Sequence, residues 1–437
     1  MQRWPRGAVA RWTVRVARGT VLVLAASACA VQGGGRSPAP KVRPGISVLL
    51  TDSIHLIRGR RVGLITNHTG LDERGESDIE RLRGPAARAA GVRLTTLYSP
   101  EHGIRGTEDR EDLASGIDAQ SGLFIHSLYK AGTIGPPDST LRDLDVLVVD
   151  LQDIGTRTWT YVGVVLYAMR ATARRNLPIV VLDRPNPISG VRPDGPFLDP
   201  SIANPEEPTA SRPGKAYALY PVPLRHALTM GEMARYFNAA LGIGARLHVV
   251  PAAGWRRAMW FDETGLPWVR PSPNMPSLAS ATTYPAIVPF EATNVSVGRG
   301  TPDAFQRLGA PWLRADSAVA LLNARNLPGV RFERSDFTPQ EATDRKYSGQ
   351  RIGGIRLVVT DRDRFAPGRT SAALLWAIRR VAPDSLVVRG PAWDDRFGRP
   401  AMREALMRGE DPDAVVARDS AAVTAWWREV ARHRLYR

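Results

Sequence analysis

The sequence predicts an α/β protein built on a parallel sheet, and two observations lead to that fold class. Short apolar segments rich in β-branched residues recur along the first half of the 437-residue chain, with helix-like segments between them. Continuous apolar strands are typical of strands buried on both faces of a sheet, and their alternation with helices favours parallel order. In addition, each apolar segment is followed by polar residues, as expected where parallel strands end beside a ligand site.

The elements fall into two predicted domains. In the first, residues 46–240, we expect strands at 61–65, 92–97, 144–150 and 178–183 and helices at 78–90, 160–175 and 230–241. Past residue 242 the chain becomes Pro-rich and irregular, with a further strand expected at 356–360 and helices at 370–381 and 420–434. This change predicts a second α/β or α+β domain over residues 241–437.

The first 29 residues have the pattern of a secretory signal, since five arginines and no acidic residue precede the apolar run at 21–28. That run is too short to span a membrane, and Cys29, the only cysteine, follows it. This layout is typical of a bacterial lipoprotein, so we expect a lipid anchor on Cys29 and a flexible linker at 30–45. The predicted location is the periplasmic face of the cell envelope. Because Ala26 stands where leucine is commonest, ordinary signal-peptidase cleavage stays open.

Composition excludes several classes of protein. With one cysteine the chain forms no intramolecular disulfide. Its formal charge of +16 favours anionic partners, but the charge is scattered and accompanies no nucleic-acid-binding motif, so we predict a wall polymer and not nucleic acid. The sequence contains no Gly-x-Gly-x-x-Gly after a strand, no P-loop, no Gly-x-Ser-x-Gly elbow and no His-x-x-x-His or EF-hand spacing. We therefore predict neither a cofactor nor a metal.

Polar side chains follow all four predicted strands of the first domain. Because the carboxyl ends of parallel strands meet at one edge of a sheet, we expect these side chains to lie close together and to bind substrate. Each group alone could be an ordinary polar turn with a capping Asp or Asn. The candidates at these strand ends are Asn67, Glu101, His102, Arg105, Asp150, Asp153, Arg157, Asp183 and Asn186.

The segment SPEHGIRG at 99–106 is the strongest candidate for an active-site loop. Its proline keeps the preceding residue extended, and its two glycines permit backbone angles that other residues resist. Glycoside hydrolysis needs a carboxylic acid to protonate the leaving oxygen, a role that Glu101 fits in a partly desolvated pocket. His102 is a candidate base or hydrogen-bonding partner. The alternative for Glu101 is a capping or loop glutamate.

Two further segments offer carboxylates beside a cation. Asp150 and Asp153 precede Arg157, an arrangement that suits substrate hydroxyls or base work and equally a structural ion pair. In the second domain, residues 290–301 supply Glu291, Asn294 and Arg299, and an arginine between glycines is able to clamp a substrate carboxylate in bidentate fashion.

Taken together, these segments resemble the exo-β-N-acetylmuramidase family NamZ over about residues 46–436. The matching motifs are RVGLITNHTG (61–70), SPEHGIRG (99–106), DVLVVDLQDIGTR (145–157), VLDRPNP (181–187), MGEM (230–233), PNMP (273–276), FEATN (290–294), GRGT (298–301) and WDDRFG (393–398). Two positions depart from the family pattern, Ala292 where glycine is common and Arg170 where many relatives are acidic.

The resemblance implies a Rossmann-like N-terminal domain, a smaller C-terminal domain and an active site in the cleft between them. It implies release of β-1,4-linked N-acetylmuramic acid from the non-reducing end of peptidoglycan fragments. Glu101 falls on the expected catalytic acid, and Asp153, Glu232 and Glu291 are the candidates for a second carboxylate. The lactyl carboxylate of muramic acid gives a reason for arginines there, and the candidates are Arg105, Arg157 and Arg299.

Two other functions stay open from the sequence. One is a non-catalytic lipoprotein that binds peptidoglycan or muropeptides, and the other is a hydrolase of amide or ester bonds in cell-wall peptides.

Overall fold

A seven-stranded sheet forms the first half of the protein in a computed structural model that describes residues 42–107, 113–128, 134–206 and 216–437. The strand order is β3-β4-β2-β1-β5-β6-β9, and all neighbours except β3 and β4 are parallel. The strands are β1 (Arg61–Thr66), β2 (Arg93–Ser99), β3 (Gly116–Ile117), β4 (Phe124–Ser127), β5 (Val146–Asp150), β6 (Ile179–Leu182) and β9 (Leu247–Val250). The four strands predicted from the sequence are its centre, and the α/β class is confirmed.

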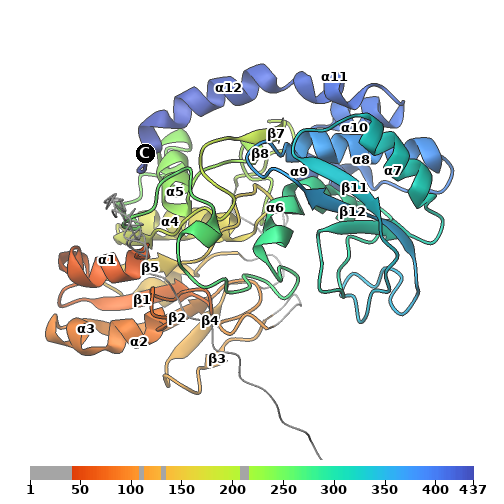
Figure 1. Cartoon of the computed structure of the whole chain (residues 1–437). Helices are drawn as coiled ribbons and strands as arrows, with labels where there is room; N and C mark the ends of the chain where they lie inside the picture. Colours follow the sequence, from red (N-terminus) through yellow and green to blue (C-terminus); the bar gives the residue numbers. More distant parts are fainter. Residues whose placement is uncertain (1–41, 108–112, 129–133, 207–215) are drawn as a thin grey trace, which may run out of the picture. The chain divides into compact units, whose positions relative to one another are not determined.

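Helices cover both faces of this sheet (Figure 1). Alternate residues of the strands enter two separate cores, so that Val148 and Val180 pack on one face while Val149 and Val181 pack on the other. The first core is closed by α1 (Gly45–Thr51), α2 (Asp78–Arg83) and α3 (Pro85–Ala89), and the second by α4 (Tyr161–Arg174) and α5 (Met230–Ala240). The single helix expected at 78–90 is two helices, because Gly84 is extended before Pro85.

Both ends of the expected N-terminal domain differ from the prediction. Residues 42–45 are not part of a free linker, since Val42 is fully buried and Arg43 exchanges backbone hydrogen bonds with Ala253. The sheet also continues past residue 240, because β9 pairs with β6 in parallel. Cys29 and the rest of the predicted signal lie outside the described residues.

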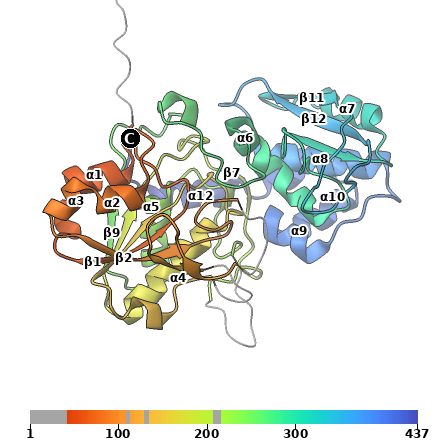
Figure 2. The same cartoon turned by 90° about the horizontal axis from the view of Figure 1, so that it is seen from below.

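The second half contains an antiparallel sheet in the order β10-β12-β11 and most of the remaining helices (Figure 2). Its elements are α6 (Leu278–Ile287), η4 (Val288–Ala292), β10 (Arg307–Ala310), α7 (Ala315–Ala324), β11 (Val330–Arg334), β12 (Gly353–Val359), α8 (Pro367–Val381), α9 (Gly390–Phe397), α10 (Pro400–Met407), α11 (Pro412–Ala417) and α12 (Ser420–Glu429). A further pair, β7 (Asp194–Phe197) and β8 (Pro223–Arg225), is antiparallel. The core around α4 and α5 continues without a break into this half.

Within the part of the chain that the structure describes, no helix is long and apolar enough to cross a membrane.

Candidate active site

Glu101 lies in a turn that starts directly after β2. Three residues of the turn, His102, Gly103 and Gly106, have positive φ angles of 70°, 73° and 68°. A Cβ atom at Gly106 would lie 1.8 Å from the nearest atom of the His68 ring, so this position requires glycine. The half-buried Glu101 carboxylate accepts a hydrogen bond of 2.6 Å from the Thr160 hydroxyl. The turn predicted from the sequence therefore directs Glu101 toward the segment that leads into α4.

Tyr161, the next residue after Thr160, connects this turn with other parts of the chain. Its hydroxyl accepts a hydrogen bond from Asn67 Nδ2 at 2.8 Å and donates one to the Pro271 carbonyl at 2.9 Å. Burial, together with the nearby negative charge of Glu101, raises the pKa of Tyr161. The end of β1, the end of β2 and the start of α4 therefore meet at one place, as expected for a parallel sheet.

Glu291, in η4, is surrounded by cations. Arg299 donates two hydrogen bonds to Glu291 Oε1, at 2.9 Å from Nε and 2.6 Å from Nη2, and Arg396 Nε lies 3.5 Å from Oε2. Burial raises the pKa of Glu291, but the charges of Arg299, Arg396 and Lys346 outweigh it, so that the pKa is lowered. Glu291 is therefore held as a carboxylate.

The side chain of Tyr217 lies within electrostatic reach of both glutamates. Its pKa is raised by burial and by the negative charges of Glu291 and Glu101, while Arg396, whose guanidinium lies 5.2 Å from the ring centre, lowers it. Coulomb interactions of this kind fade over several ångströms in a partly buried site. The charges of Glu101, from the first half of the chain, and of Glu291, from the second half, thus both act on Tyr217.

A row of aromatic rings connects the surroundings of Glu101 with those of Glu291. Trp159 lies edge-on to Tyr161 and to Tyr284 of α6, with ring centres 5.5 Å and 5.9 Å apart. Tyr284 in turn lies 4.6 Å from Phe305, again centre to centre. Burial and the charge of Glu291 raise the pKa of Tyr284. The rings fix the position of α6 relative to the segment that carries Thr160.

Asp150 and Asp153 serve the interior of the protein. Asp150 is fully buried and forms an ion pair with Arg184, whose Nη2 lies 2.9 Å from Asp150 Oδ2. Asp153 is also buried, and its Oδ2 accepts a hydrogen bond from the Gly155 N–H at 2.7 Å and faces His226 Nε2 at 3.3 Å. Asp150 thus pairs with Arg184 and not with Arg157, the cation that the sequence placed beside it.

Glu232 and Asp183 form a second buried group with residues near 436. Glu232 completes a capping box with Thr229 at the start of α5, pairs with Arg257 and accepts the Leu435 N–H at 2.8 Å. Asp183 accepts hydrogen bonds from the hydroxyls of Thr229 (2.6 Å) and Tyr436 (2.7 Å). These contacts occupy the carboxylates that the sequence offered for catalysis and binding.

Four other predicted binding residues make structural contacts. Arg157 is buried, and its guanidinium donates to the carbonyls of Pro196, Val222, Arg396 and Phe397 at 2.7 to 3.0 Å. Burial lowers the pKa of Arg157 to about 9. Asn186 bridges Leu228 and Ile188, and Asn294 bridges Ser385 and Val387. Arg105, half exposed, pairs with Asp118.

The structure adds four residues that the sequence did not single out: Thr160, Tyr217, Lys346 and Arg396. Lys346 donates to the carbonyls of Glu291 and Val295, both at 3.1 Å, and so fixes the backbone on both sides of the Glu291 loop. Only Arg396 had a signal, its place in the motif WDDRFG. The others meet the glutamates through the tertiary fold alone.

Both halves of the chain match one family of known proteins. The N-terminal domain of exo-β-N-acetylmuramidase NamZ matches residues 62–279, and the C-terminal domain of the same family matches residues 282–436. The peptidoglycan β-N-acetylmuramidase NamZ of Bacillus subtilis (strain 168) is 39% identical over 363 residues, which is 83% of each chain.

Two crystal structures of DUF1343 family proteins from Bacteroides fragilis are also similar. One has a TM-score of 0.78 at 30% identity and the other 0.70 at 25%, and each match covers 91% of this chain and 99% of the other. The two family domains meet near the start of α6, the helix that carries Tyr284. The chain therefore belongs to the exo-β-N-acetylmuramidase family NamZ, a family of glycosidases.

Proposed function

We propose that this protein is an exo-acting glycosidase that releases terminal β-1,4-linked N-acetylmuramic acid from the non-reducing end of peptidoglycan fragments. Glu101 acts as the general acid on the leaving oxygen, and Glu291 acts on the anomeric carbon as base or nucleophile. The observation that supports these roles is the row of rings Tyr161, Trp159 and Tyr284, which joins the segment bonded to Glu101 to α6 beside Glu291, together with the charges of both glutamates on Tyr217.

The surroundings of the two glutamates suit different tasks. Glu101 touches a neutral hydroxyl, that of Thr160, which accommodates both the protonated and the ionised carboxyl. Glu291 is paired with arginines, which favour the ionised form that a base or nucleophile requires. Among the candidates for the second carboxylate we therefore favour Glu291 over Asp153 and Glu232. For the lactyl carboxylate we favour the arginines nearest to Glu291, Arg299 and Arg396.

The test uses substrates with two leaving groups. A 4-nitrophenyl glycoside of N-acetylmuramic acid departs with little help from an acid, whereas the natural disaccharide needs protonation. Glu101→Gln should therefore lower kcat by about 10² to 10⁴ on the disaccharide and much less on the nitrophenyl glycoside. Glu291→Gln should lower both. Glu404→Gln, at an exposed carboxylate of α10, is the matched control and should lower neither.

The outcomes separate the functions that the sequence left open. Full activity of Glu101→Gln on the disaccharide would refute the role of Glu101. Binding of muramyl ligands by the unaltered protein without release of sugar would identify a binding lipoprotein, and release of a peptide without free N-acetylmuramic acid would identify an amide or ester hydrolase. The configuration of the first product, read by NMR, separates inversion, in which Glu291 acts as base, from retention, in which Glu291 or the 2-acetamido group of the sugar attacks the anomeric carbon.

We further propose that the protein is exported and anchored to a membrane by lipid on Cys29. Support comes from the arginine-rich start, the short apolar run and the cysteine that follows it. In cells, the unaltered protein should incorporate labelled palmitate and sediment with membranes, and Cys29→Ser should do neither. Release of both proteins into the soluble periplasmic fraction would instead indicate ordinary signal-peptidase cleavage.

A further inference from the structure

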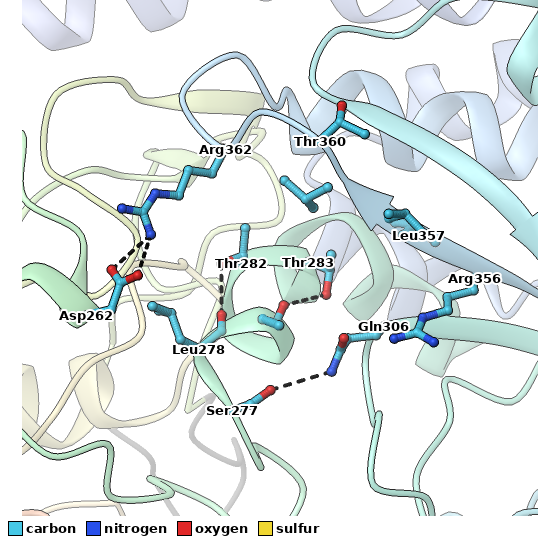
Figure 3. A pocket seen from close by; sticks show the side chains of 13 residues that line it. Asp262, Ser277, Leu278, Thr282, Thr283, Gln306, Arg356, Leu357, Thr360 and Arg362 are labelled. Carbon is cyan, nitrogen blue, oxygen red and sulfur yellow. Dashed lines mark hydrogen bonds and ion pairs between the residues drawn. The ribbon is translucent and has the colours of Figure 1, made fainter. Parts of the chain in front are cut away.

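A groove of about 680 Å³ lies between the start of α6 and strand β12 (Figure 3). At one end of it Arg362 is paired with Asp262, and at the other end Gln306 Nε2 lies 3.5 Å from the Ser277 hydroxyl (Figure 3). None of the residues proposed for catalysis lines this groove. The lactyl carboxylate, which the reacting sugar itself carries, therefore meets its cation elsewhere.

A cation beside Glu291 has one nitrogen without a protein partner. Arg396, in α9, has its Nε 3.5 Å from Glu291 Oε2 and donates from Nη1 to the Ala392 carbonyl at 3.0 Å. Its third nitrogen, Nη2, hydrogen-bonds with no residue that the structure describes. The side chains of Arg396 and Glu291 are 20% and 15% exposed, so both are reached from solvent. Arg396 is therefore able to bind an anion next to the carboxylate of Glu291.

Arg299, which also pairs with Glu291, is already engaged. It donates from Nε and Nη2 to Glu291 Oε1, at 2.9 and 2.6 Å, and its Nη1 lies 3.4 Å from the Thr343 hydroxyl. All three nitrogens of this guanidinium thus have partners in the protein. Of the two arginines that we favour for the lactyl carboxylate, Arg396 is the one with a nitrogen to offer.

Tyr217 lies against the guanidinium of Arg396, whose central carbon is 5.2 Å from the centre of the tyrosine ring. Burial lowers the pKa of Arg396, but the charges of Tyr217 and Glu291 outweigh it and raise the pKa, as expected for oxygens close to the guanidinium. The hydroxyl of the half-buried Tyr217 hydrogen-bonds with none of the residues that the structure describes. Because burial raises the pKa of Tyr217, this hydroxyl keeps its proton at neutral pH and is available as a donor.

A close backbone approach places Tyr217 beside the start of α4. A Cβ atom at Gly163 would lie 2.5 Å from the carbonyl oxygen of Ala216, the residue before Tyr217. Gly163 belongs to the first turn of α4, and its N–H donates to the Thr160 carbonyl at 3.0 Å. The hydroxyl of Thr160 in turn holds Glu101. Tyr217 therefore follows a backbone segment that rests on the helical turn holding the first glutamate, and its ring lies against the arginine that pairs with the second.

The lactyl group distinguishes muramic acid from glucosamine. It is attached through the oxygen on C3 of the sugar, two carbons from the anomeric carbon, and it ends in a carboxylate. When Glu291 faces the anomeric carbon, this short arm brings the carboxylate near the groups around Glu291. The two oxygens of a carboxylate accept well from one guanidinium nitrogen and one neutral hydroxyl.

We propose that Tyr217 is a specificity-determining residue, whose hydroxyl binds one oxygen of the lactyl carboxylate while Arg396 Nη2 binds the other. The inference rests on the proposed function, because that function places the sugar at Glu291. Tyr217 takes no part in breaking the glycosidic bond, so loss of its hydroxyl should raise KM and leave kcat nearly unchanged. Its role thereby differs from that of Glu101, which acts on the leaving oxygen.

The experiment compares two 4-nitrophenyl glycosides of N-acetylmuramic acid, one with the free lactyl carboxylate and one with the neutral lactyl carboxamide. We expect the unaltered protein to have a KM about tenfold lower for the carboxylate, which corresponds to one charged hydrogen bond. Tyr217→Phe keeps the ring against Arg396 and removes only the hydroxyl, so it should raise KM for the carboxylate about tenfold and KM for the carboxamide much less. Tyr220→Phe, at a half-buried tyrosine whose ring centre lies 5.7 Å from that of Tyr236, is the matched control and should change neither.

Three results would overturn the inference and leave the proposed function standing. One is an equal KM for both glycosides in the unaltered protein. Another is an unchanged KM for the carboxylate in folded Tyr217→Phe. The third is an equal rise of KM for both glycosides in that variant, because the hydroxyl would then contact another part of the sugar.

A second variant decides the matter if Tyr217→Phe does not fold. Difluorotyrosine at position 217 keeps the size and the hydroxyl of tyrosine but lowers the pKa of the phenol. Its ionised form repels a carboxylate, so KM for the carboxylate should begin to rise at a lower pH than in the unaltered protein, and KM for the carboxamide should not. The same pH dependence for both glycosides would overturn the inference.

If neither glycoside is cleaved, binding separates the two proposals. Free N-acetylmuramic acid and N-acetylglucosamine are titrated against the intact protein by calorimetry. Tighter binding of N-acetylmuramic acid that Tyr217→Phe abolishes would support the inference although the proposed function has failed. Equal binding of the two sugars, or no binding to the unaltered protein, would overturn it.

Discussion

Replacing Asp183 by asparagine is expected to change how the stability of the protein depends on pH. Burial raises the pKa of the Asp183 carboxyl from its ordinary 3.8 to about 7. An unfolded chain loses this proton at lower pH than the folded protein does, so ionisation at Asp183 destabilises the folded state. The contribution of Asp183 to stability is fully present below pH 4, falls as the pH rises to about 7 and is constant above. A difference of roughly 3 units at 1.36 kcal/mol each amounts to about 4 kcal/mol.

Urea unfolding at pH 5 and pH 8 measures this effect. Asparagine has the shape of aspartate and is neutral at both pH values, so the difference in unfolding free energy between the variant and the unaltered protein isolates Asp183. With the two pKa values above, the unfolding free energy of Asp183→Asn, relative to that of the unaltered protein, should rise by about 2.5 kcal/mol from pH 5 to pH 8. An equal difference at both pH values, or a change of opposite sign, would refute the reasoning that Asp183 is held protonated by burial.

Three further substitutions test the structure. Gly106→Ala should lower the free energy of urea unfolding by about 1 to 3 kcal/mol and also lower kcat, because residue 106 has a φ of 68° and the new methyl group would clash with the His68 ring. An unchanged unfolding free energy and kcat would contradict this close approach. Arg157→Met should lower the free energy of unfolding by about 1 to 3 kcal/mol, because it leaves buried carbonyls without a donor, and should not change KM. A raised KM would show that Arg157 binds substrate. Trp393→Ala should lower the free energy of unfolding by about 3 to 5 kcal/mol, because Trp393 is fully buried with its ring centre 5.1 Å from that of Phe290. A calorimetric Tm close to that of the unaltered protein would argue against this packing.

The centre of the fold could be predicted from the sequence because burial on both faces leaves an apolar pattern in β1, β5 and β6. Strand β9, at the edge of the sheet, was missed because it lacks such an apolar pattern. Its residue His248 is exposed, and the segment follows a change in composition that suggested a new domain. Its place in the sheet comes from its pairing with β6 and not from the strand propensity of its own residues. Edge strands carry a weaker signal than central ones.

The candidate site was predictable in part. Glu101 stood out because a proline and two glycines surround it after a strand, and those residues shape the turn in the structure. Glu232 could have been set aside, since Thr229 three residues earlier is the spacing of a capping box. No local pattern distinguishes Glu291 as the partner of Glu101. That pairing depends on Tyr217, whose neighbours come from both halves of the chain.

The contacts of Asp183 with residues near 436 have a consequence for the order of folding. The hydrogen bond from Tyr436 to Asp183 joins residues 253 positions apart, and Leu435 reaches Glu232 across 203 positions. A nascent chain that has only its first 250 residues therefore possesses every strand of the large sheet but leaves two buried carboxylates without these partners. Such long-range closure slows folding and favours its completion only after the whole chain has emerged. We expect a chain stopped before residue 430 to be recovered as an aggregating species and not as a smaller folded protein.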